Sequence, residues 1–293
     1  MYDIEELYEA ESAEHAVALL REHPQARIIA GGSDVLIEIR EGRIAGCSLV
    51  SIQKIDALRG VGMDGEGGIR IGALTSFSHV SADPIIRKHI PVLGEAVDTI
   101  GGPQLRNIGT IGGNVCNGVT SADSASTLMA WDAVMEYLGP GGPRRLPIRE
   151  HYTGAGKTSL ARDEILRAIV IPRESYENCF GSYIKYAMRE ALDIATLGCS
   201  ANVLLSPDGK RIMRLRLAYG VAGPVPLRTP SAEAAAAGRA ADEETIRAAA
   251  EAAPRDLNPR TSWRAGREFR LHLAVELAKR TIRESIKRAG GSI

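Results

Sequence analysis

Two glycine-rich turns are the part of this sequence best suited to bind a phosphate group. They read AGGSD at residues 30–34 and GTIGGN at residues 109–114. A bound phosphate needs several backbone N–H groups converging on it, and glycine permits that approach because it has no side chain and takes positive φ without strain. In AGGSD, the Ser33 hydroxyl is a further donor, and Asp34 can cap a following helix, whose free N–H groups add attraction.

Neither turn matches a standard nucleotide-binding fingerprint. GxGxxG within one strand–helix–strand unit and GxxxxGK[ST] are both absent from the chain. A single Gly-Gly pair after a strand is most often an ordinary turn. Because two such loops occur in one predicted domain, an ordinary turn and a phosphate-binding site are equally good interpretations of them. Arg27 and Arg106 are the nearest basic residues, so backbone dipoles would hold a phosphate more than side-chain charge does.

The other reactive side chains form no pattern of their own. The six histidines are dispersed and no catalytic triad is visible, so we predict no catalytic residue and no metal ligand. The four cysteines contain no CxxC pair, which argues against a zinc or iron–sulfur site on this chain. Free thiols in a reducing compartment are the simpler interpretation, and they favour a cytoplasmic location. These cysteines are Cys47, Cys116, Cys179 and Cys199.

Composition narrows the class of protein further. The 293 residues suffice for about two domains. Lys plus Arg and Asp plus Glu both number 36, and aromatic residues make up 4%, a balance that disfavours binding to nucleic acid or to an anionic membrane. The acidic start MYDIEELYEAESAEH lacks the apolar segment of a secretory signal, and no run of 18 apolar residues predicts a membrane span.

Predicted elements place AGGSD directly after a strand. Residues 12–23 are expected to form a helix capped by Ser12, ARIIA a buried strand, residues 33–42 a second helix, and CSLVSI a second strand. Downstream, residues 67–74 read as a strand, 83–99 as one helix, 122–133 as a helix and 134–138 as a strand. GTIGGN therefore lies between two predicted helices.

The pattern of predicted secondary structure changes after Pro172, and we therefore place a domain boundary near residues 173–180. Strands are expected at 181–189, 194–205 and 212–223, followed by an alanine-rich helical region at 232–253 and a final helix at about 264–289. On the first of these strands, Tyr183, Lys185, Ala187 and Arg189 would share one face. A lysine there is usually solvated, and we expect Arg189 and Asp193 to form a structural ion pair.

Taken together, AGGSDVL and GGPQLRNIGTIGGNVCNGVTSADS (101–124) resemble the FAD-binding, or medium, subunits of the molybdenum hydroxylases, above all those of bacterial three-subunit xanthine dehydrogenases. DEILRAIVIP (163–172), YIKYAMREALDIATLGCSA (183–201) and PRTSWRAGREFRLHLA (259–274) agree in order, so the resemblance covers almost the whole chain. It implies an α+β fold: a vanillyl-alcohol-oxidase-like (PCMH-type) FAD-binding domain at 1–175, with subdomains at about 1–56 and 57–175, and a C-terminal α+β domain at 176–293.

The resemblance also assigns residues to FAD. The AGGSD loop would wrap the pyrophosphate of FAD, and the GTIGGN loop would form the other side of the phosphate site. Asn107 would orient the GTIGGN loop, and Asp123 would bind the sugar part of FAD. Ile100 stands where the family often has a residue over the isoalloxazine ring, Leu166 would lie near the flavin or adenine, and Lys185 near the pyrimidine edge. The full expected set is Arg27, Ile28, Ile29, Ala30, Gly31, Gly32, Ser33, Asp34, Ile100, Asn107, Gly109, Thr110, Ile111, Gly112, Gly113, Asn114, Asp123, Leu166 and Lys185.

The function implied by the resemblance is electron transfer within a larger oxidoreductase. Electrons would reach FAD from 2Fe-2S clusters on an iron–sulfur subunit, after hydroxylation at a molybdopterin centre on a large subunit, and would pass to NAD⁺. The lack of cysteine clusters agrees with iron–sulfur centres on another chain. Two alternatives stay open: the same module in a complex acting on nicotinate, carbon monoxide, an aldehyde or an aromatic CoA thioester, and a stand-alone flavin reductase.

Overall fold

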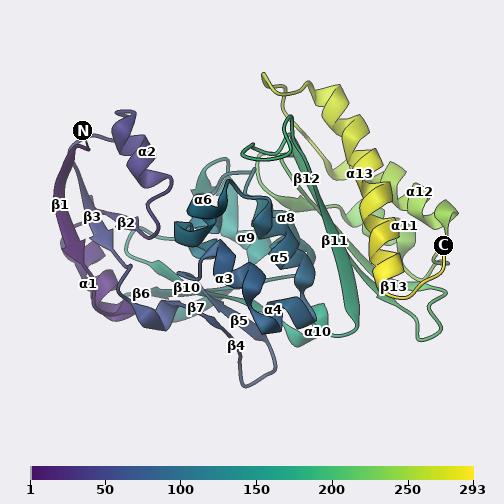
Figure 1. The fold of residues 1–293 in the computed structure, drawn as a ribbon, viewed down its shortest axis with the longest axis horizontal. Helices are drawn as coiled ribbons and strands as arrows, with labels where there is room; N and C mark the ends of the chain where they lie inside the picture. The colour runs from purple at the N-terminus through teal and green to yellow at the C-terminus, as the bar shows by residue number, and fades with distance from the viewer. Residues whose placement is uncertain (1) are drawn as a thin grey trace.

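The computed structural model describes residues 2–293, which form three larger β-sheets and a two-stranded sheet of β8 and β9, with helices packed against the larger sheets (Figure 1). The N-terminal lobe is built from β1 (Ile4–Glu9), α1 (Ala13–Glu22), β2 (Arg27–Ile29), α2 (Val35–Arg40) and β3 (Cys47–Ser51). Its sheet has the order β1-β3-β2, and both pairings are parallel. The expected strand–loop–helix–strand unit is present, whereas β1 escaped sequence analysis because the segment IEELYE is too polar to give a strand signal.

The middle region is a five-stranded antiparallel sheet of order β4-β5-β10-β6-β7. Its strands are β4 (Val61–Met63), β5 (Ile69–Gly72), β6 (Val134–Gly139), β7 (Gly142–Pro147) and β10 (Ile165–Ile171). Its helices are α3 (Phe77–Ala82), α4 (Pro84–His89), α5 (Pro91–Asp98), α6 (Pro103–Ile108), α7 (Ile111–Cys116) and α8 (Asp123–Ala130). Helices and strands of this region share the largest apolar core of the chain.

The single helix expected at 83–99 is wrong, because the chain forms α4 and α5 with a break at Ile90. Ile90 has φ −140° and ψ 54°, well outside the helical region. Proline at position 91 explains the break, since its ring clashes with a helical conformation of the preceding residue and it donates no N–H bond. Minor elements complete this part of the chain: η1 (Asp56–Leu58), α9 (Ile148–His151), β8 (Tyr152–Gly154), β9 (Lys157–Thr158) and α10 (Arg173–Tyr176).

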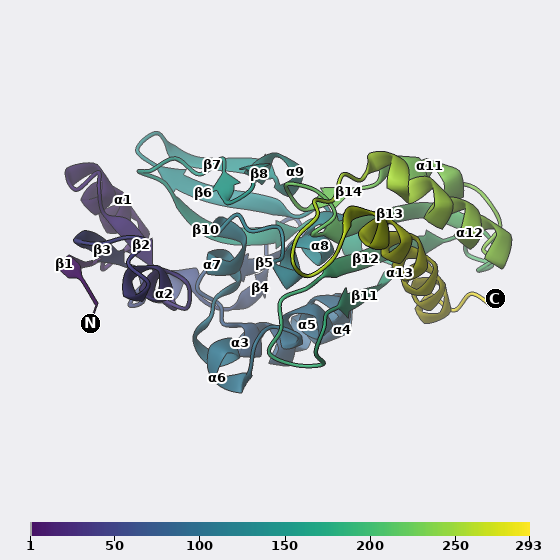
Figure 2. The ribbon, with the colours of Figure 1, turned by 90° about the horizontal axis from the view of Figure 1, so that it is seen from above.

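The C-terminal region is a four-stranded sheet of order β11-β12-β13-β14. It contains β11 (Cys179–Tyr186), β12 (Leu197–Leu205), β13 (Ile212–Gly220) and β14 (Leu227–Arg228), with α11 (Pro230–Ala236), α12 (Glu243–Ala252), η2 (Ala253–Asp256) and α13 (Arg267–Arg288). The helices cover the outer side of this sheet, away from the middle region (Figure 2). The expected strand at 181–189 ends at Tyr186, so Ala187 and Arg189 lie beyond it and the shared face extends only over Tyr183 and Lys185.

Helix α8 joins the middle region to the C-terminal sheet through charged contacts at both of its ends. At its C-terminal end, Asp132 contacts Arg216 of β13 at 2.6 Å and Arg228 of β14 at 2.5 Å. At its N-terminal end, Asp123 contacts β11. These contacts tie β11, β13 and β14 to the two ends of α8. Within residues 2–293, no helix is long and apolar enough to cross a membrane.

Candidate functional site

The two glycine-rich loops lie in direct backbone contact, although about 75 residues separate them in sequence. A Cβ atom added to Gly31 would stand 2.0 Å from the carbonyl oxygen of Ile108, so any side chain at residue 31 would push the loops apart. Gly32 follows with φ +74°, a conformation that side chains rarely adopt. The AGGSD turn therefore needs both of its glycines, the first for close approach and the second for its backbone conformation.

Free backbone donors are concentrated in the first loop. The N–H groups of Gly31, Gly32, Ser33 and Asp34 make no hydrogen bond to any residue of the described chain, 2–293. Asp34 occupies the position before α2 but makes no side-chain cap bond, which contradicts its expected capping role. Instead, the Ser33 hydroxyl donates to the Asp34 carboxylate at 3.4 Å. Four consecutive unpaired N–H groups at one turn fit a phosphate or pyrophosphate ligand.

The second loop is arranged differently, because five of its six N–H groups, all but that of Thr110, already donate to groups within residues 2–293. The N–H groups of Ile111 and Gly112 donate to the carbonyls of Thr75 and Ala73, at 3.0 and 2.9 Å. Thr110 caps α7: its hydroxyl accepts from the Gly113 N–H at 3.1 Å, and its carbonyl accepts from Asn114. The expectation that this loop offers its backbone donors as the first loop does is therefore wrong.

The glycines of GTIGGN also have structural reasons to be glycine. A Cβ at Gly112 would lie 2.5 Å from the Ala73 carbonyl oxygen, and one at Gly109 would lie 2.7 Å from the Phe77 ring. Gly113 is exposed in the first turn of α7, has no positive φ, and meets only the Thr110 hydroxyl at 3.0 Å. The glycines at 109 and 112 therefore let α7 pack against the chain beneath it, and Gly113 alone faces outward.

A buried charged cluster stands where α8 meets β11, beside Ser124, whose hydroxyl donates to Asn114 of the second loop. The Lys185 ammonium lies 2.8 Å from Asp123 Oδ2 and donates to the Thr99 carbonyl at 3.0 Å. The Tyr183 hydroxyl donates to Asp123 Oδ1 at 2.8 Å. The side chains of Lys185 and Asp123 are 9% and 7% exposed. A charge pair this well buried needs hydrogen-bond partners for its polar atoms, and both oxygens of Asp123 and two of the three N–H groups of Lys185 have one.

Burial dominates the electrostatics of the cluster. It raises the pKa of the Asp123 carboxyl above its ordinary value, and the ammonium of Lys185 and the hydroxyl of Tyr183 offset that rise only in part. The pKa of the Tyr183 phenol is raised well above its ordinary value by burial and by the neighbouring carboxylate. Tyr183 therefore stays a neutral hydrogen-bond donor, and one N–H of the Lys185 ammonium remains for a ligand, since two of its three are engaged.

Several expected ligand residues turn out to be packing residues. Leu166 and Ile111 are 4% and 0% exposed in the core of the middle region, so their side chains have little surface to offer a cofactor. Ile100 is partly buried against the same core. These three side chains pack in or against the core, and only their backbone atoms or side-chain edges can contact a bound molecule.

The polar residues of the set are more accessible. Asn107 does not bond the second loop as expected; its side-chain oxygen accepts from the Ser78 hydroxyl at 2.6 Å. The Asn114 side-chain oxygen accepts from the Ser124 hydroxyl at 2.6 Å, which leaves its amide donors uncommitted. Arg27 pairs with Glu38 at 3.2 Å on the exposed side of the lobe. Ile28, Ile29 and Ala30 carry the chain from β2 into the first loop and are half-buried.

Sequence analysis missed two members of the charged cluster. Thr99 contributes a backbone carbonyl, which leaves no trace in the sequence. Tyr183 was recognisable only as a neighbour of Lys185 on one strand face. The expected ion pair of Arg189 and Asp193 is confirmed at 3.8 Å. Within residues 2–293, no group of three or more His, Cys, Asp or Glu residues is arranged to hold a metal ion.

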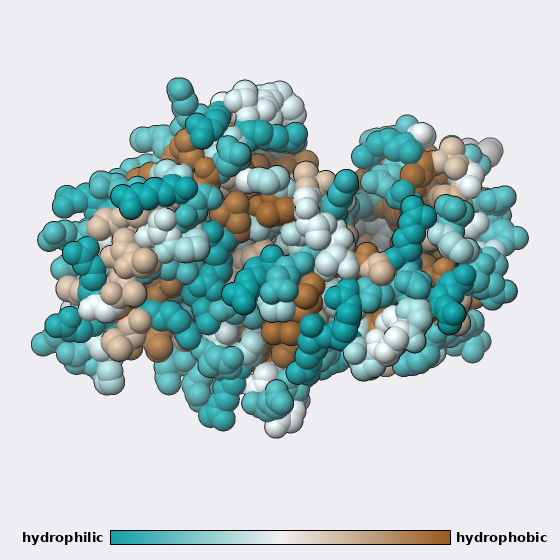
Figure 3. All heavy atoms as spheres, turned by 180° about the vertical axis from the view of Figure 1, so that it is seen from behind, coloured by the Kyte–Doolittle hydropathy of each residue, from teal (hydrophilic) through white to brown (hydrophobic). Residues whose placement is uncertain are grey.

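Figure 3 shows a hollow in the surface between the N-terminal lobe and the rest of the molecule. A flavin dinucleotide suits this set of groups because unpaired N–H groups at the first loop can take its pyrophosphate and a lysine with a spare donor can take a polar ring edge. The contact of Gly31 with the Ile108 backbone holds the first loop, with its unpaired N–H groups, against the second. The residues present therefore fit FAD.

Comparison with known families identifies the class of protein. Residues 2–174 match the FAD-binding domain in molybdopterin dehydrogenase, and residues 182–285 match the CO dehydrogenase flavoprotein C-terminal domain. The chain belongs to the FAD-binding subunits of the molybdopterin dehydrogenase family, and its α+β fold is the PCMH-like FAD-binding domain followed by that C-terminal domain.

Individual relatives cover the chain from end to end. The putative xanthine dehydrogenase FAD-binding subunit of Escherichia coli strain K12 is 42% identical over 293 residues, which is 100% of both chains. The carbon monoxide dehydrogenase medium chain of Hydrogenophaga pseudoflava is 29% identical over 278 residues, 94% of this chain and 95% of that one. A solved structure of the carbon monoxide dehydrogenase from that organism contains a chain that matches with a TM-score of 0.92, over 99% of both chains.

Proposed function

We propose that this chain is the FAD subunit of a xanthine dehydrogenase, taking electrons from 2Fe-2S clusters on a partner subunit and delivering them to NAD⁺. One observation carries the proposal: identity to the Escherichia coli subunit is 42% over both full lengths, whereas relatives named for carbon monoxide, nicotinate and nicotine are 29–31% identical. Bound FAD would supply the redox chemistry, accepting single electrons and releasing a hydride.

The chain's own residues would bind and orient that cofactor. The unpaired N–H groups of residues 31–34 would hold the pyrophosphate, with the side chains of Thr110 and Asn114 completing the phosphate side. Asp123, already ordered by Tyr183, would accept from the sugar portion. These roles rest on the unpaired donors and on the loop contact at Gly31.

Lys185 would stabilise negative charge at the pyrimidine edge of the flavin. The support for this role is its fixed position: two contacts hold the ammonium in place, and little water reaches it. A preorganised cation in a poorly solvated site lowers the free energy of nearby negative charge more than a mobile surface lysine does. The role of Lys185 would therefore be to raise the affinity of the bound flavin for electrons.

The proposal includes partners and a location. An iron–sulfur subunit would have to approach the FAD site, and a molybdopterin subunit would carry the substrate reaction; the relatives are named as single subunits of larger enzymes, and one solved structure is named for its molybdenum cofactor. A cytoplasmic location fits four free thiols. The competing substrates, nicotinate, carbon monoxide, an aldehyde or a CoA thioester, would be oxidised or reduced on the large subunit, so the fold of this chain does not discriminate between them.

Two measurements test the proposal in order. The purified chain, supplied with FAD, is expected to show flavin absorption with one FAD per chain; a folded protein that takes up none would end the assignment. The complex isolated through a tag on this chain is then expected to reduce NAD⁺ with xanthine and not with nicotinate or carbon monoxide. Turnover with one of the other substrates alone would keep the FAD role and reject the xanthine assignment.

A further inference from the structure

A group of arginines at the start of α13 has no acidic partner within the described chain. No carboxylate of residues 2–293 forms an ion pair with any of them. Glu268 is the one acidic residue of segment 259–270, so that segment carries a net charge of +3. We refer to these arginines as the arginine cluster, and they are Arg260, Arg264, Arg267 and Arg270.

Arg270 is the buried member of the cluster. Its side chain is 2% exposed, and its guanidinium donates to the Thr196 carbonyl at 3.1 Å, to the Ser262 hydroxyl at 2.9 Å and to the Arg260 carbonyl. All three acceptors are neutral. Burial lowers the pKa of Arg270, and the charges of Arg260 and Arg264 lower it further. A buried cation among other cations costs free energy unless an anion compensates for it.

The imbalance of charge remains when the neighbouring loop is included. The loop between β11 and β12 lies beside the cluster, because Arg270 bonds the Thr196 carbonyl at the end of that loop. Its charged residues are Arg189, Glu190 and Asp193, a net charge of −1. The loop and segment 259–270 together therefore keep a net charge of +2.

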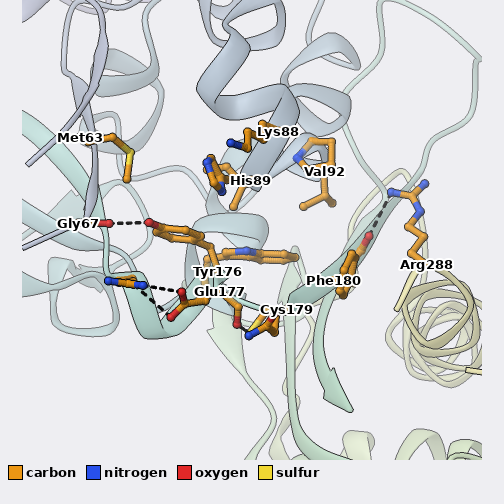
Figure 4. Close-up of a pocket in the computed structure, with 16 residues that line it drawn as sticks. Met63, Gly67, Lys88, His89, Val92, Tyr176, Glu177, Cys179, Phe180 and Arg288 are labelled. Carbon is orange, nitrogen blue, oxygen red and sulfur yellow. Dashed lines mark hydrogen bonds and ion pairs between the residues drawn. The ribbon is translucent and has the colours of Figure 1, made fainter. Parts of the chain in front are cut away.

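Arginines at another surface of the chain are compensated from within. At the cavity of about 500 Å³ between the α4–α5 junction and β11, Arg288 contacts Glu95 at 2.8 Å, and Arg173 contacts Glu177 at 2.7 Å (Figure 4). Each guanidinium at that cavity has a carboxylate of the same chain beside it. For the arginine cluster, the compensating negative charge would have to come from another molecule.

Exposed aromatic side chains border the arginine cluster. Trp263 and Phe269 are 76% and 46% exposed, and the Arg264 guanidinium lies over the Trp263 ring, 4.3 Å from its centroid. The Phe269 ring meets the Tyr186 ring at 6.0 Å, so the exposed side chains of Tyr186 and Met188 join the same surface. Large apolar side chains gathered in one place mark contact surfaces, and Trp, Tyr and Arg contribute most of the binding energy there.

We propose that this surface, the arginine cluster with Tyr186, Met188, Trp263 and Phe269, binds a partner subunit that places an aspartate or glutamate side chain against Arg260 and Arg264. Relatives of this family are named as subunits or medium chains of larger enzymes, so a protein partner suits the chain. A carboxylate there would compensate for the buried charge of Arg270. A free small anion would also do so, but it would leave the Trp263 and Phe269 rings exposed.

The affinity of the chain for its own complex tests the proposal. Binding of the full-length chain to the remaining subunits of that complex, purified together, can be measured by biolayer interferometry. Arg264→Met is expected to weaken binding at least tenfold and to make its dependence on sodium chloride shallower, because a charge contact is lost. Trp263→Ala is expected to weaken binding at least tenfold as well, since a buried tryptophan at an interface is commonly a main source of affinity.

Matched variants outside this surface serve as controls. Arg247→Met, on the exposed side of α12, and Met213→Ala, at the other end of the C-terminal sheet, are expected to leave the affinity unchanged. All four variants should bind FAD as the parent does. The proposal does not depend on the FAD contacts or on xanthine as the substrate, so loss of flavin and loss of assembly are separate results.

Three outcomes overturn the proposal. The first is unchanged affinity in both Arg264→Met and Trp263→Ala; because Trp263 is mostly exposed, its variant tests the surface even if Arg264→Met lowers stability. The second is an equal loss of affinity in the control variants. The third is an isolated chain that sediments as a dimer and that Trp263→Ala converts to a monomer, because a second copy of the chain would then occupy the surface.

Discussion

Lys185→Met tests whether the buried pair with Asp123 is held together as its geometry implies. The substitution keeps most of the aliphatic volume but leaves the Asp123 carboxylate, which is 7% exposed, with only the Tyr183 hydroxyl as a side-chain partner. Removing one member of a buried pair typically costs about 3–5 kcal/mol, because the remaining charge stays desolvated. We expect the free energy of unfolding to fall by that amount in neutral buffer.

The pH dependence of this loss has a definite sign. The pKa of folded Asp123 is already raised by burial, and Lys185 is the main group that opposes the rise, so the variant's carboxyl has a still higher folded pKa. A carboxyl whose pKa is higher in the folded than in the unfolded state costs stability as pH rises from its unfolded value, about 3.9. Urea unfolding should therefore show a smaller deficit at about pH 5 than at about pH 8.

Two comparisons make the test decisive. The double variant Lys185→Met/Asp123→Asn removes both charges and should recover most of the lost stability. Lys54→Met breaks a pair of similar length, 2.7 Å, whose side chains are 69% and 54% exposed, and should cost under about 1 kcal/mol. If the single and double variants at position 185 are equally unstable, or if the loss is the same at both pH values, the carboxylate is not the source of the cost.

Three further predictions follow from named contacts. In FAD-loaded protein, Lys185→Met should keep the flavin bound and lower its reduction potential by about 30 mV or more, equivalent to about 1.4 kcal/mol for two electrons; an unchanged potential in a spectroelectrochemical titration would make the lysine structural. Gly31→Ala should reduce FAD affinity at least tenfold because its Cβ would strike the Ile108 carbonyl, whereas Gly113→Ala should bind FAD nearly as well as the parent; equal losses in equilibrium dialysis would contradict the assigned roles. His151 is fully buried between Tyr137 and the Val115 carbonyl, and burial lowers its pKa, so stability should fall as pH drops below about 6.5; His151→Phe should flatten that part of the unfolding profile, and an unaltered slope would show that another group is responsible.

Much of the local structure could be predicted because its causes lie within a few residues. The strand–loop–helix unit around Gly31 and Gly32 was readable from apolar runs broken by glycine, and the long C-terminal helix from its repeating apolar stripe. Sequence patterns failed where the signal was weak or contradictory: β1 is too polar to stand out, and the break at Ile90 depends on one proline within an otherwise helical stretch.

The sequence by itself determined the kind of site: bare backbone in two loops, no cysteine or histidine cluster, and family motifs in a fixed order along the chain. Only the tertiary structure shows which loop has free N–H donors and which loop packs against the chain beneath it. Gly112 is glycine because Ala73 lies beneath it, and the free donors belong to residues 31–34. Asp123 and Lys185 meet across 62 residues of sequence. Such facts depend on which atoms the fold brings within a few ångströms, and local residue preferences carry no information about that.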